Sequence, residues 1–116
     1  MYAGHDAVRG FQLYCSDPSG NYGSWKAHAT GKGSVNAIST LKTDYQQEST
    51  LKDALILAAK VLGKSMDTTT PNADKYEIAV ITKDADGNIV QRRVEGDELN
   101  KILEEAKIFE IKKWLC

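Results

Sequence analysis

Two short turn sequences, each between stretches of strand-like alternation, constrain the fold most strongly. Phe11, Leu13 and Cys15 alternate with Gln12 and Tyr14, which is the period-two pattern of a strand with one buried face. Asp17-Pro18-Ser19-Gly20 follows, with Pro second and Gly fourth, as a type I turn prefers. We therefore predict a hairpin whose return strand covers 22–30, with Trp25, Ala27 and Ala29 on one face and Ser24, Lys26 and His28 on the other.

The second turn sequence is Asp84-Ala85-Asp86-Gly87-Asn88. Before it, Tyr76, Ile78 and Val80 alternate with Glu77, Ala79 and Ile81, and after it 89–94 has the composition of a partner strand. Asp-Gly between two strand patterns is a strong hairpin signal. We therefore predict a second antiparallel hairpin.

Three segments between and after these hairpins show helical spacing. Ser34 is a candidate cap for a helix with Val35, Ile38, Leu41 and Tyr45 on one face. Thr50, with Asp53 three residues later, resembles a capping box for a second helix that presents Leu51, Ala54, Leu55, Ala58, Val61 and Leu62. The polar stretch 68–72 reads as a loop, and a third helix is expected after Gly96, with Leu99, Ile102, Leu103 and Ala106 facing the core.

The predicted order is strand, strand, helix, helix, strand, strand, helix. Hairpins and helix pairs in this order indicate an α+β fold, with antiparallel sheets covered by helices, and argue against a doubly wound nucleotide-binding fold. The 116 residues allow a single domain, or part of one, with a modest core.

Charge and cysteine content exclude several classes of protein. Fifteen basic residues against 16 acidic ones give a net charge of −1, with no basic cluster for nucleic acid. Cys15 and Cys116 form neither a disulfide framework nor a metal-ligand spacing. The sequence has no signal-peptide pattern and no apolar stretch of membrane-spanning length, so we expect a cytoplasmic and nuclear protein.

The segment around the first turn resembles the signature of the proteasome α-type subunit family of the 20S core particle. It comprises Gly10-Phe11-Gln12-Leu13-Tyr14 and then Asp17, Pro18, Ser19, Gly20, Asn21, Tyr22, Trp25 and Lys26. Downstream, Leu41-Lys42, Asp44-Tyr45 and Thr50-Leu51-Lys52 extend the resemblance to one type within that family.

The resemblance implies an αββα sandwich of the N-terminal-nucleophile-hydrolase type, of which residues 1–116 would be a single partial domain, the C-terminal half. It also implies a non-catalytic structural subunit of the α ring, which supports assembly and substrate gating in ubiquitin-dependent protein degradation. The implied partners are other α subunits, β subunits and regulatory cap particles, with no cofactor, metal, nucleic acid or membrane.

The two ends depart from the family pattern. Met1-Tyr2-Ala3-Gly4 falls where the family is already inside a strand, so we expect the N-terminal helix and about half of the sandwich to be missing. The segment 108–116 is apolar where the resemblance implies a charged tail, and nothing in the sequence explains it. A truncated, non-assembling fragment is therefore one alternative, and its exposed strand edges would favour aggregation.

An active threonine-type hydrolase, like the catalytic β subunits, is the second alternative. It needs a free N-terminal threonine, whereas this chain opens with Met1-Tyr2, and exposing Thr30 would remove the hairpin. A nucleophilic triad could draw on His5, Asp6, His28 and Cys15. We favour a solvated His28 and a core thiol at Cys15 instead.

Three segments resemble binding motifs, and a structural interpretation fits each of them better. Gly31-Lys32-Gly33-Ser34 lacks the spacing of a P-loop, so a glycine break with a serine cap is favoured. Asp84, Asp86, Asn88 and Glu95 resemble calcium-loop ligands, but Ile89 stands where that loop requires Gly. Tyr14, Tyr22, Trp25 and Lys26 could stack nucleic-acid bases, although packing in a sheet or subunit interface suits a chain of this charge better.

Overall fold

The computed structural model describes residues 1–65 and 76–115, with side chains described for 1–64 and 76–106. The predicted loop at 68–72 lies outside the described residues. The described elements are β1 (Tyr2–Asp6), β2 (Gly10–Ser16), β3 (Tyr22–Trp25), α1 (Ser34–Asp44), α2 (Leu51–Ser65), β4 (Ile78–Lys83), β5 (Ile89–Val94) and α3 (Asp97–Leu115). The predicted α+β class, with antiparallel sheets and helices, is confirmed.

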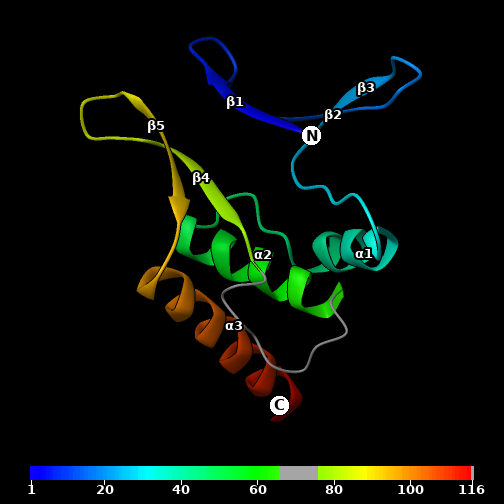
Figure 1. The fold of residues 1–116 in the computed structure, drawn as a ribbon, viewed down its shortest axis with the longest axis vertical. Helices are drawn as coiled ribbons and strands as arrows, with labels where there is room; N and C mark the ends of the chain where they lie inside the picture. Colours follow the sequence, from blue (N-terminus) through cyan, green and yellow to red (C-terminus); the bar gives the residue numbers. More distant parts are fainter. Residues whose placement is uncertain (66–75, 116) are drawn as a thin grey trace.

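The strands form two separate antiparallel sheets, one with the order β1-β2-β3 and one made of β4 and β5. Figure 1 shows the three-stranded sheet above the helices, β4 and β5 rising beside it, and α2 and α3 below. The residue pattern missed β1, although the family resemblance places a strand at residues 1–4, so the order begins with three strands rather than two. Gly4, His5 and Asp6 hide the strand pattern of this segment, and pairing with β2, from Tyr2 opposite Tyr14 to Asp6 opposite Gly10, makes it a strand.

The predicted return strand is too long, because β3 ends at Trp25 and 26–33 is irregular. The predicted Ser34 cap is also wrong. Gly33 is the N-cap of α1, in a left-handed conformation with φ of 75°, and no side chain caps the helix. Glycine adopts this conformation without the steric cost that a Cβ imposes, so the helix begins directly after it.

The second helix begins as the sequence predicts. The backbone N–H of Asp53 donates to Oγ1 of Thr50 at 3.2 Å, which is one half of the predicted capping box. The second hairpin is also confirmed, although β4 begins at Ile78 rather than at Tyr76.

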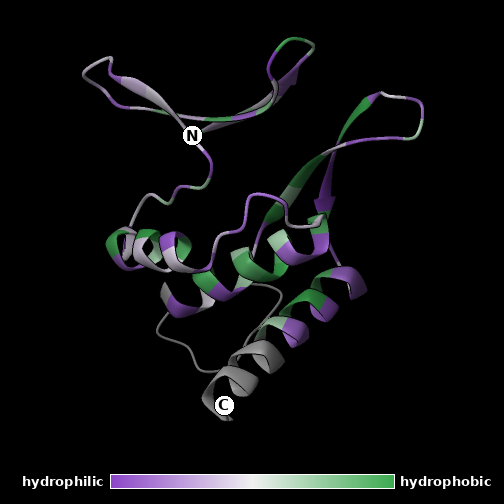
Figure 2. Cartoon of the chain, turned by 180° about the vertical axis from the view of Figure 1, so that it is seen from behind, coloured by the Kyte–Doolittle hydropathy of each residue, from purple (hydrophilic) through white to green (hydrophobic). Residues whose placement is uncertain are grey.

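The hydrophobic core lies between α2, α3 and the β4–β5 sheet. Its buried residues are Leu55, Ala59, Tyr76, Ile78, Val80, Val94, Leu99, Ile102, Leu103 and Ala106. Figure 2 shows hydrophobic residues recurring along α2 and along the described part of α3, which lie side by side. The four predicted core positions of α3 are all buried, whereas Val35 of α1 and Leu62 of α2 are 77% and 42% exposed. No residue of the three-stranded sheet belongs to this core.

A buried ion pair joins α1 to α2. Nζ of Lys60 lies 2.8 Å from Oδ2 of Asp44, and the two side chains are 2% and 20% exposed. The hydrophobic pattern of α2 gives no sign of a buried lysine. Asp44 is the last residue of α1, where the helix dipole disfavours a negative charge, so Lys60 stabilises the end of α1 as well as the helix pair.

A second ion pair joins β5 to the first turn of α3. The guanidinium of Arg92 donates to both carboxylate oxygens of Glu98, at 2.8 and 3.0 Å. These hydrogen bonds lower the pKa of Glu98 and raise that of Arg92. Because both side chains are close to half exposed, the pair orients the start of α3 and adds little stability.

The position of the core generates a first prediction. Leu55→Ala should lower the free energy of unfolding by about 2–5 kcal/mol, because it leaves a cavity in the core. Leu51→Ala, one turn earlier in α2 at a side chain that is 44% exposed, should cost roughly 0.5 kcal/mol. Urea denaturation followed by circular dichroism measures both, and equal losses would contradict this placement of the core.

The buried ion pair generates a second prediction. Asp44→Asn should destabilise the chain by about 3 kcal/mol, because it removes the carboxylate that pairs with the buried ammonium of Lys60. The matched control is Glu105→Gln, which breaks the exposed pair of Lys52 and Glu105 and should cost less than about 1 kcal/mol. Urea denaturation measures both variants. A smaller loss of unfolding free energy for Asp44→Asn than for Glu105→Gln would contradict a stabilising role of the Lys60–Asp44 ion pair.

Candidate functional site: an uncovered sheet and an inter-sheet groove

The signature turn is a closed hairpin end organised by one carboxylate. The backbone N–H of Gly20 donates to the carbonyl of Asp17 at 3.1 Å, as in the predicted turn. Oδ1 of Asp17 accepts the backbone N–H groups of Ser19 and Asn21, at 3.0 and 3.2 Å, and also the Ser19 hydroxyl. Pro18 and Gly20, with its φ of 90°, supply the backbone angles that the turn needs.

The hairpin at Asp84 repeats the same arrangement. Oδ1 of Asp84 accepts the N–H groups of Asp86 and Asn88, at 3.0 and 2.8 Å, and Gly87 bonds back to the carbonyl of Asp84. The hairpin interpretation is therefore confirmed over the calcium-loop one for this segment. Among the described residues, no group of three or more His, Cys, Asp or Glu side chains is arranged to hold a metal ion.

The three-stranded sheet has two faces of different chemistry. Strand alternation and register place Ala3, His5, Phe11, Leu13, Cys15 and Trp25 on one face, which we call the inner face. The outer face carries Tyr2, Tyr14, Ser16, Tyr22 and Ser24. Tyr2 and Tyr22 are 65% and 78% exposed on the outer face, and Phe11 and Trp25 are 54% and 48% exposed on the inner face. Both faces of this sheet are therefore largely uncovered by described residues.

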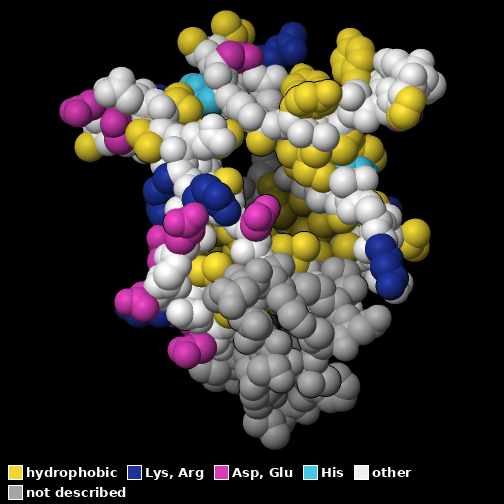
Figure 3. Space-filling model, in the orientation of Figure 1, with side chains coloured by type: hydrophobic (Ala, Val, Ile, Leu, Met, Phe, Trp, Pro, Cys, Tyr) yellow, Lys and Arg dark blue, Asp and Glu magenta, His cyan; other side chains and the backbone are white. Residues whose placement is uncertain are grey.

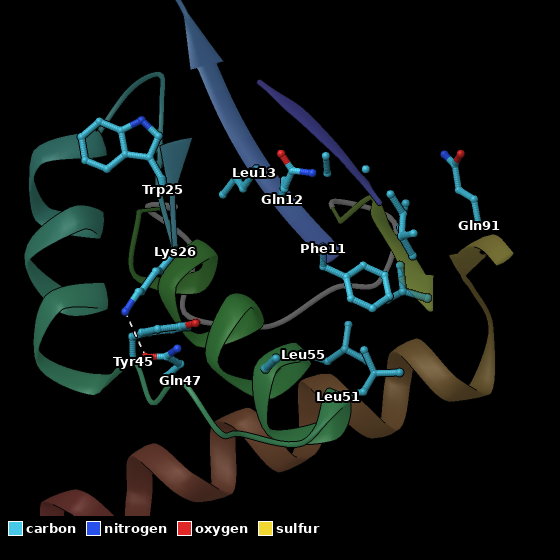
Figure 4. A pocket seen from close by; sticks show the side chains of 16 residues that line it. Phe11, Gln12, Leu13, Trp25, Lys26, Tyr45, Gln47, Leu51, Leu55 and Gln91 are labelled. Atoms are coloured by element: carbon cyan, nitrogen blue, oxygen red, sulfur yellow. Dashed lines mark hydrogen bonds between the residues drawn. The ribbon is translucent and has the colours of Figure 1, made fainter. Parts of the chain in front are cut away.

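The inner face borders a groove that the other described residues leave open. This inter-sheet groove has a volume of about 920 Å³ and lies between the inner face, α2 and the β4–β5 sheet. Figure 4 shows Phe11 and Leu13 reaching into it from β2, and Leu51 and Leu55 from α2. The space-filling view in Figure 3 shows hydrophobic side chains in the hollow between the upper sheet and the helices.

One side-chain hydrogen bond links the sheet to the helices at the end of this groove. Nζ of Lys26 donates to Oε1 of Gln47 at 2.9 Å (Figure 4). Gln47 belongs to the connection between α1 and α2. Beside it, the rings of Trp25 and His28 stack with their centroids 4.3 Å apart. His28 is half-buried rather than solvated, and its Nδ1 has no hydrogen-bond partner among the described residues.

Among the described residues, the candidate catalytic and base-stacking side chains do not come together as a site. The ring of His5 packs edge-on against Phe11, while the carboxylate of Asp6 accepts the N–H of Val8 at 2.9 Å and the amide of Gln12 at 2.6 Å. Cys15 is half-buried on the inner face rather than in the core. The proposed stacking platform is divided, because Tyr14 and Tyr22 lie on the outer face and Trp25 on the inner face.

The size of the exposed surface is unusual for a chain of this mass. Its accessible surface is 8841 Å², whereas a compact protein of this mass exposes roughly 6,300 Å². Its radius of gyration is 15.1 Å, against about 13.4 Å for a compact domain of this length. The chain therefore exposes more surface than a typical compact monomer of its mass.

Comparison with known proteins places the chain in a family. The family model described as "Proteasome subunit" matches residues 1–81, which include the uncovered sheet, α1 and α2. The chain therefore belongs to the proteasome subunit family. Within that family it is similar to α-type subunits. It is 43% identical over 106 residues to proteasome subunit alpha type-4 of Spinacia oleracea, covering 91% of this chain and 42% of that protein.

Two further relatives are also α-type subunits. The probable proteasome subunit alpha type-3 of Schizosaccharomyces pombe is 39% identical over 104 residues, covering 89% of this chain and 42% of that protein. Alpha type-4-A of Arabidopsis thaliana is 51% identical over 81 residues, covering 70% of this chain and 32% of that protein. The chain thus spans well under half the length of the curated relatives that it matches. In the part of the chain searched, no helix is long and apolar enough to cross a membrane.

The carboxylates of the hairpin turns generate a third prediction. The Ser19 hydroxyl, followed by the N–H groups of Ser19 and Asn21, lowers the pKa of Asp17. The N–H of Arg9 and the amide of Gln12 lower the pKa of Asp6 in the same way. A lowered folded-state pKa means that each carboxylate stabilises its turn above the ordinary aspartate pKa of about 3.9. This contribution is lost as the pH falls through the lowered value.

We therefore expect the Ser19 and Asn21 amide signals to shift only at a pH below that ordinary value, in an NMR titration of the first hairpin. Asp17→Asn, which removes the ionisable group, should abolish this transition. A carboxyl group that titrates at or above the ordinary aspartate pKa would contradict the assigned hydrogen bonds.

Proposed function

We propose that this chain is part of a non-catalytic structural subunit of the 20S proteasome α ring, of type 4, with residues 1–116 as one partial domain. In this role it supports ring assembly and substrate gating in ubiquitin-dependent protein degradation. The similarity to α-type and type-4 relatives supports this proposal.

The observation that carries the proposal is the three-stranded sheet, which exposes aromatic side chains on both faces and contributes nothing to the core. A standard protein interface buries about 800 Å² on each partner. The uncovered faces of this sheet are therefore available for burial against neighbouring subunits. Burial of this surface would drive assembly.

The proposed partners are neighbouring α subunits, β subunits and regulatory cap particles, in the cytoplasm and the nucleus. A net charge of −1 gives little long-range attraction or repulsion, so recognition would rest on shape and apolar contact. The exposed aromatic residues Tyr2, Tyr22 and Trp25 belong to residue types that are enriched at protein interfaces.

Size-exclusion chromatography of the tagged chain from its own cells, with mass spectrometry of the co-eluting proteins, tests the proposal. We expect co-elution with other α subunits and with β subunits in a large complex. A chain that elutes alone, or only as an aggregate, would exclude assembly and favour the alternative of a non-assembling product. Peptides from upstream of Met1 would show whether the cellular protein is longer.

A further inference from the structure

The turn between β4 and β5 contains the one Asp-Gly sequence of this protein. Asp86 is the only aspartate that a glycine follows, and no asparagine precedes a glycine. Figure 1 shows this turn at the end of the hairpin that points away from the helices. Asp86 and Gly87 are both exposed. Because exposed turns of small and polar residues open readily, this dipeptide is accessible to reactions with water.

The two aspartates of this turn have opposite surroundings. The carboxylate of Asp84 is held in place, because its Oδ1 accepts the backbone N–H groups of Asp86 and Asn88 at 3.0 and 2.8 Å. The carboxylate of Asp86 makes no hydrogen bond or ion pair with another described residue. It can therefore rotate toward the backbone nitrogen of Gly87, and glycine has no Cβ to obstruct that approach.

From these features we propose that Asp86 is a site of spontaneous isoaspartate formation, and that the hydrogen bonds of Asp84 restrain the reaction. This proposal does not rest on the proposed function, because it concerns only the covalent chemistry of one turn in this chain.

The reaction is a cyclisation followed by hydrolysis. The backbone nitrogen of Gly87 attacks Cγ of Asp86 and forms a new C–N bond. The carboxyl hydroxyl leaves with the amide proton of Gly87 as a water molecule, which gives a cyclic succinimide. Water then opens the ring. Cleavage at Cγ restores aspartate, whereas cleavage at the main-chain carbonyl of Asp86 leaves the chain linked through Cγ, as isoaspartate.

The closed turn holds the attacking atom. The N–H of Gly87 donates to the carbonyl of Asp84 at 3.1 Å, and Gly87 has a φ of 86°. The nitrogen must leave this hydrogen bond before it can reach Cγ, so the reaction needs local opening of the turn. The carboxylate of Asp84 opposes that opening through its two N–H partners. Its removal should therefore speed the reaction.

Isoaspartate would change the hairpin, because it adds one methylene to the main chain within the turn. The N–H of Asp84 donates to the carbonyl of Asn88 at 2.9 Å and closes the turn. A longer connection displaces Asn88 from Asp84 and loosens this end of the hairpin. At the other end, Ile78 pairs with Val94, and both remain in the core.

The test incubates the whole chain at neutral pH and physiological temperature and maps its peptides by mass spectrometry. Isoaspartate leaves the mass of a peptide unchanged but alters its elution and its cleavage by aspartate-directed proteases. We expect isoaspartate to form at position 86 at least about tenfold faster than at Asp84, which is held, or at Asp17, where Pro18 has no N–H to react. Similar rates at these aspartates, or no isoaspartate at position 86, would overturn the proposal.

Three variants separate the cyclisation from the restraint. Gly87→Ala should slow the reaction by at least about fivefold, because its Cβ obstructs the attack. Asp86→Asn should speed it by about tenfold, because ammonia leaves more easily than hydroxide and the barrier falls. Asp84→Ala should speed it by at least about threefold, because the turn opens more often. Far-UV circular dichroism checks that each variant keeps the helical core.

The variants give distinct contradicting outcomes. An unchanged rate in Gly87→Ala would overturn cyclisation through the Gly87 nitrogen. A rate in Asp84→Ala no higher than in the native chain would overturn the restraint by Asp84. Co-elution of the chain with α and β subunits from cells would leave the proposed function standing in either case.

Discussion

Burial of the apolar faces of α2 and α3 against β4 and β5 is the interaction on which the rest of the structure depends. All ten residues of the core cluster lie in or next to these four elements. The three-stranded sheet is attached to this unit through the irregular segment 26–33 and the hydrogen bond from Lys26 to Gln47. Its own order comes from backbone pairing and from the turns that close its hairpins.

This division explains how a chain with a modest core can keep a large apolar surface exposed. Hydrogen bonds within a hairpin are satisfied locally, so the sheet does not need the core to pair its backbone groups. Its side chains, however, remain largely uncovered by described residues on both faces. An exposed apolar surface of this kind promotes aggregation in water. Its burial by another polypeptide is favourable in free energy.

Local chemistry explains which elements could be predicted. The turns at Asp17 and Asp84 follow from Asp, Gly and Asn at fixed positions, and their carboxylates bind backbone N–H groups in the structure as turn chemistry requires. The apolar spacing of α3 likewise identified its buried face. Two misses have equally local causes: β1 has no alternating pattern, and Gly33 ends the irregular segment in a conformation that precludes a cap at Ser34.

The sequence by itself determined the fold class, the two turn-centred hairpins, the second helix cap and the family resemblance, because each depends on residues close together in the chain. Only the tertiary structure decided that Lys60 is buried against Asp44, that Tyr14 and Trp25 lie on opposite faces, and that the two sheets enclose a groove. These features depend on which elements pack together, and side-chain burial is settled by that packing and not by hydrophobic pattern alone.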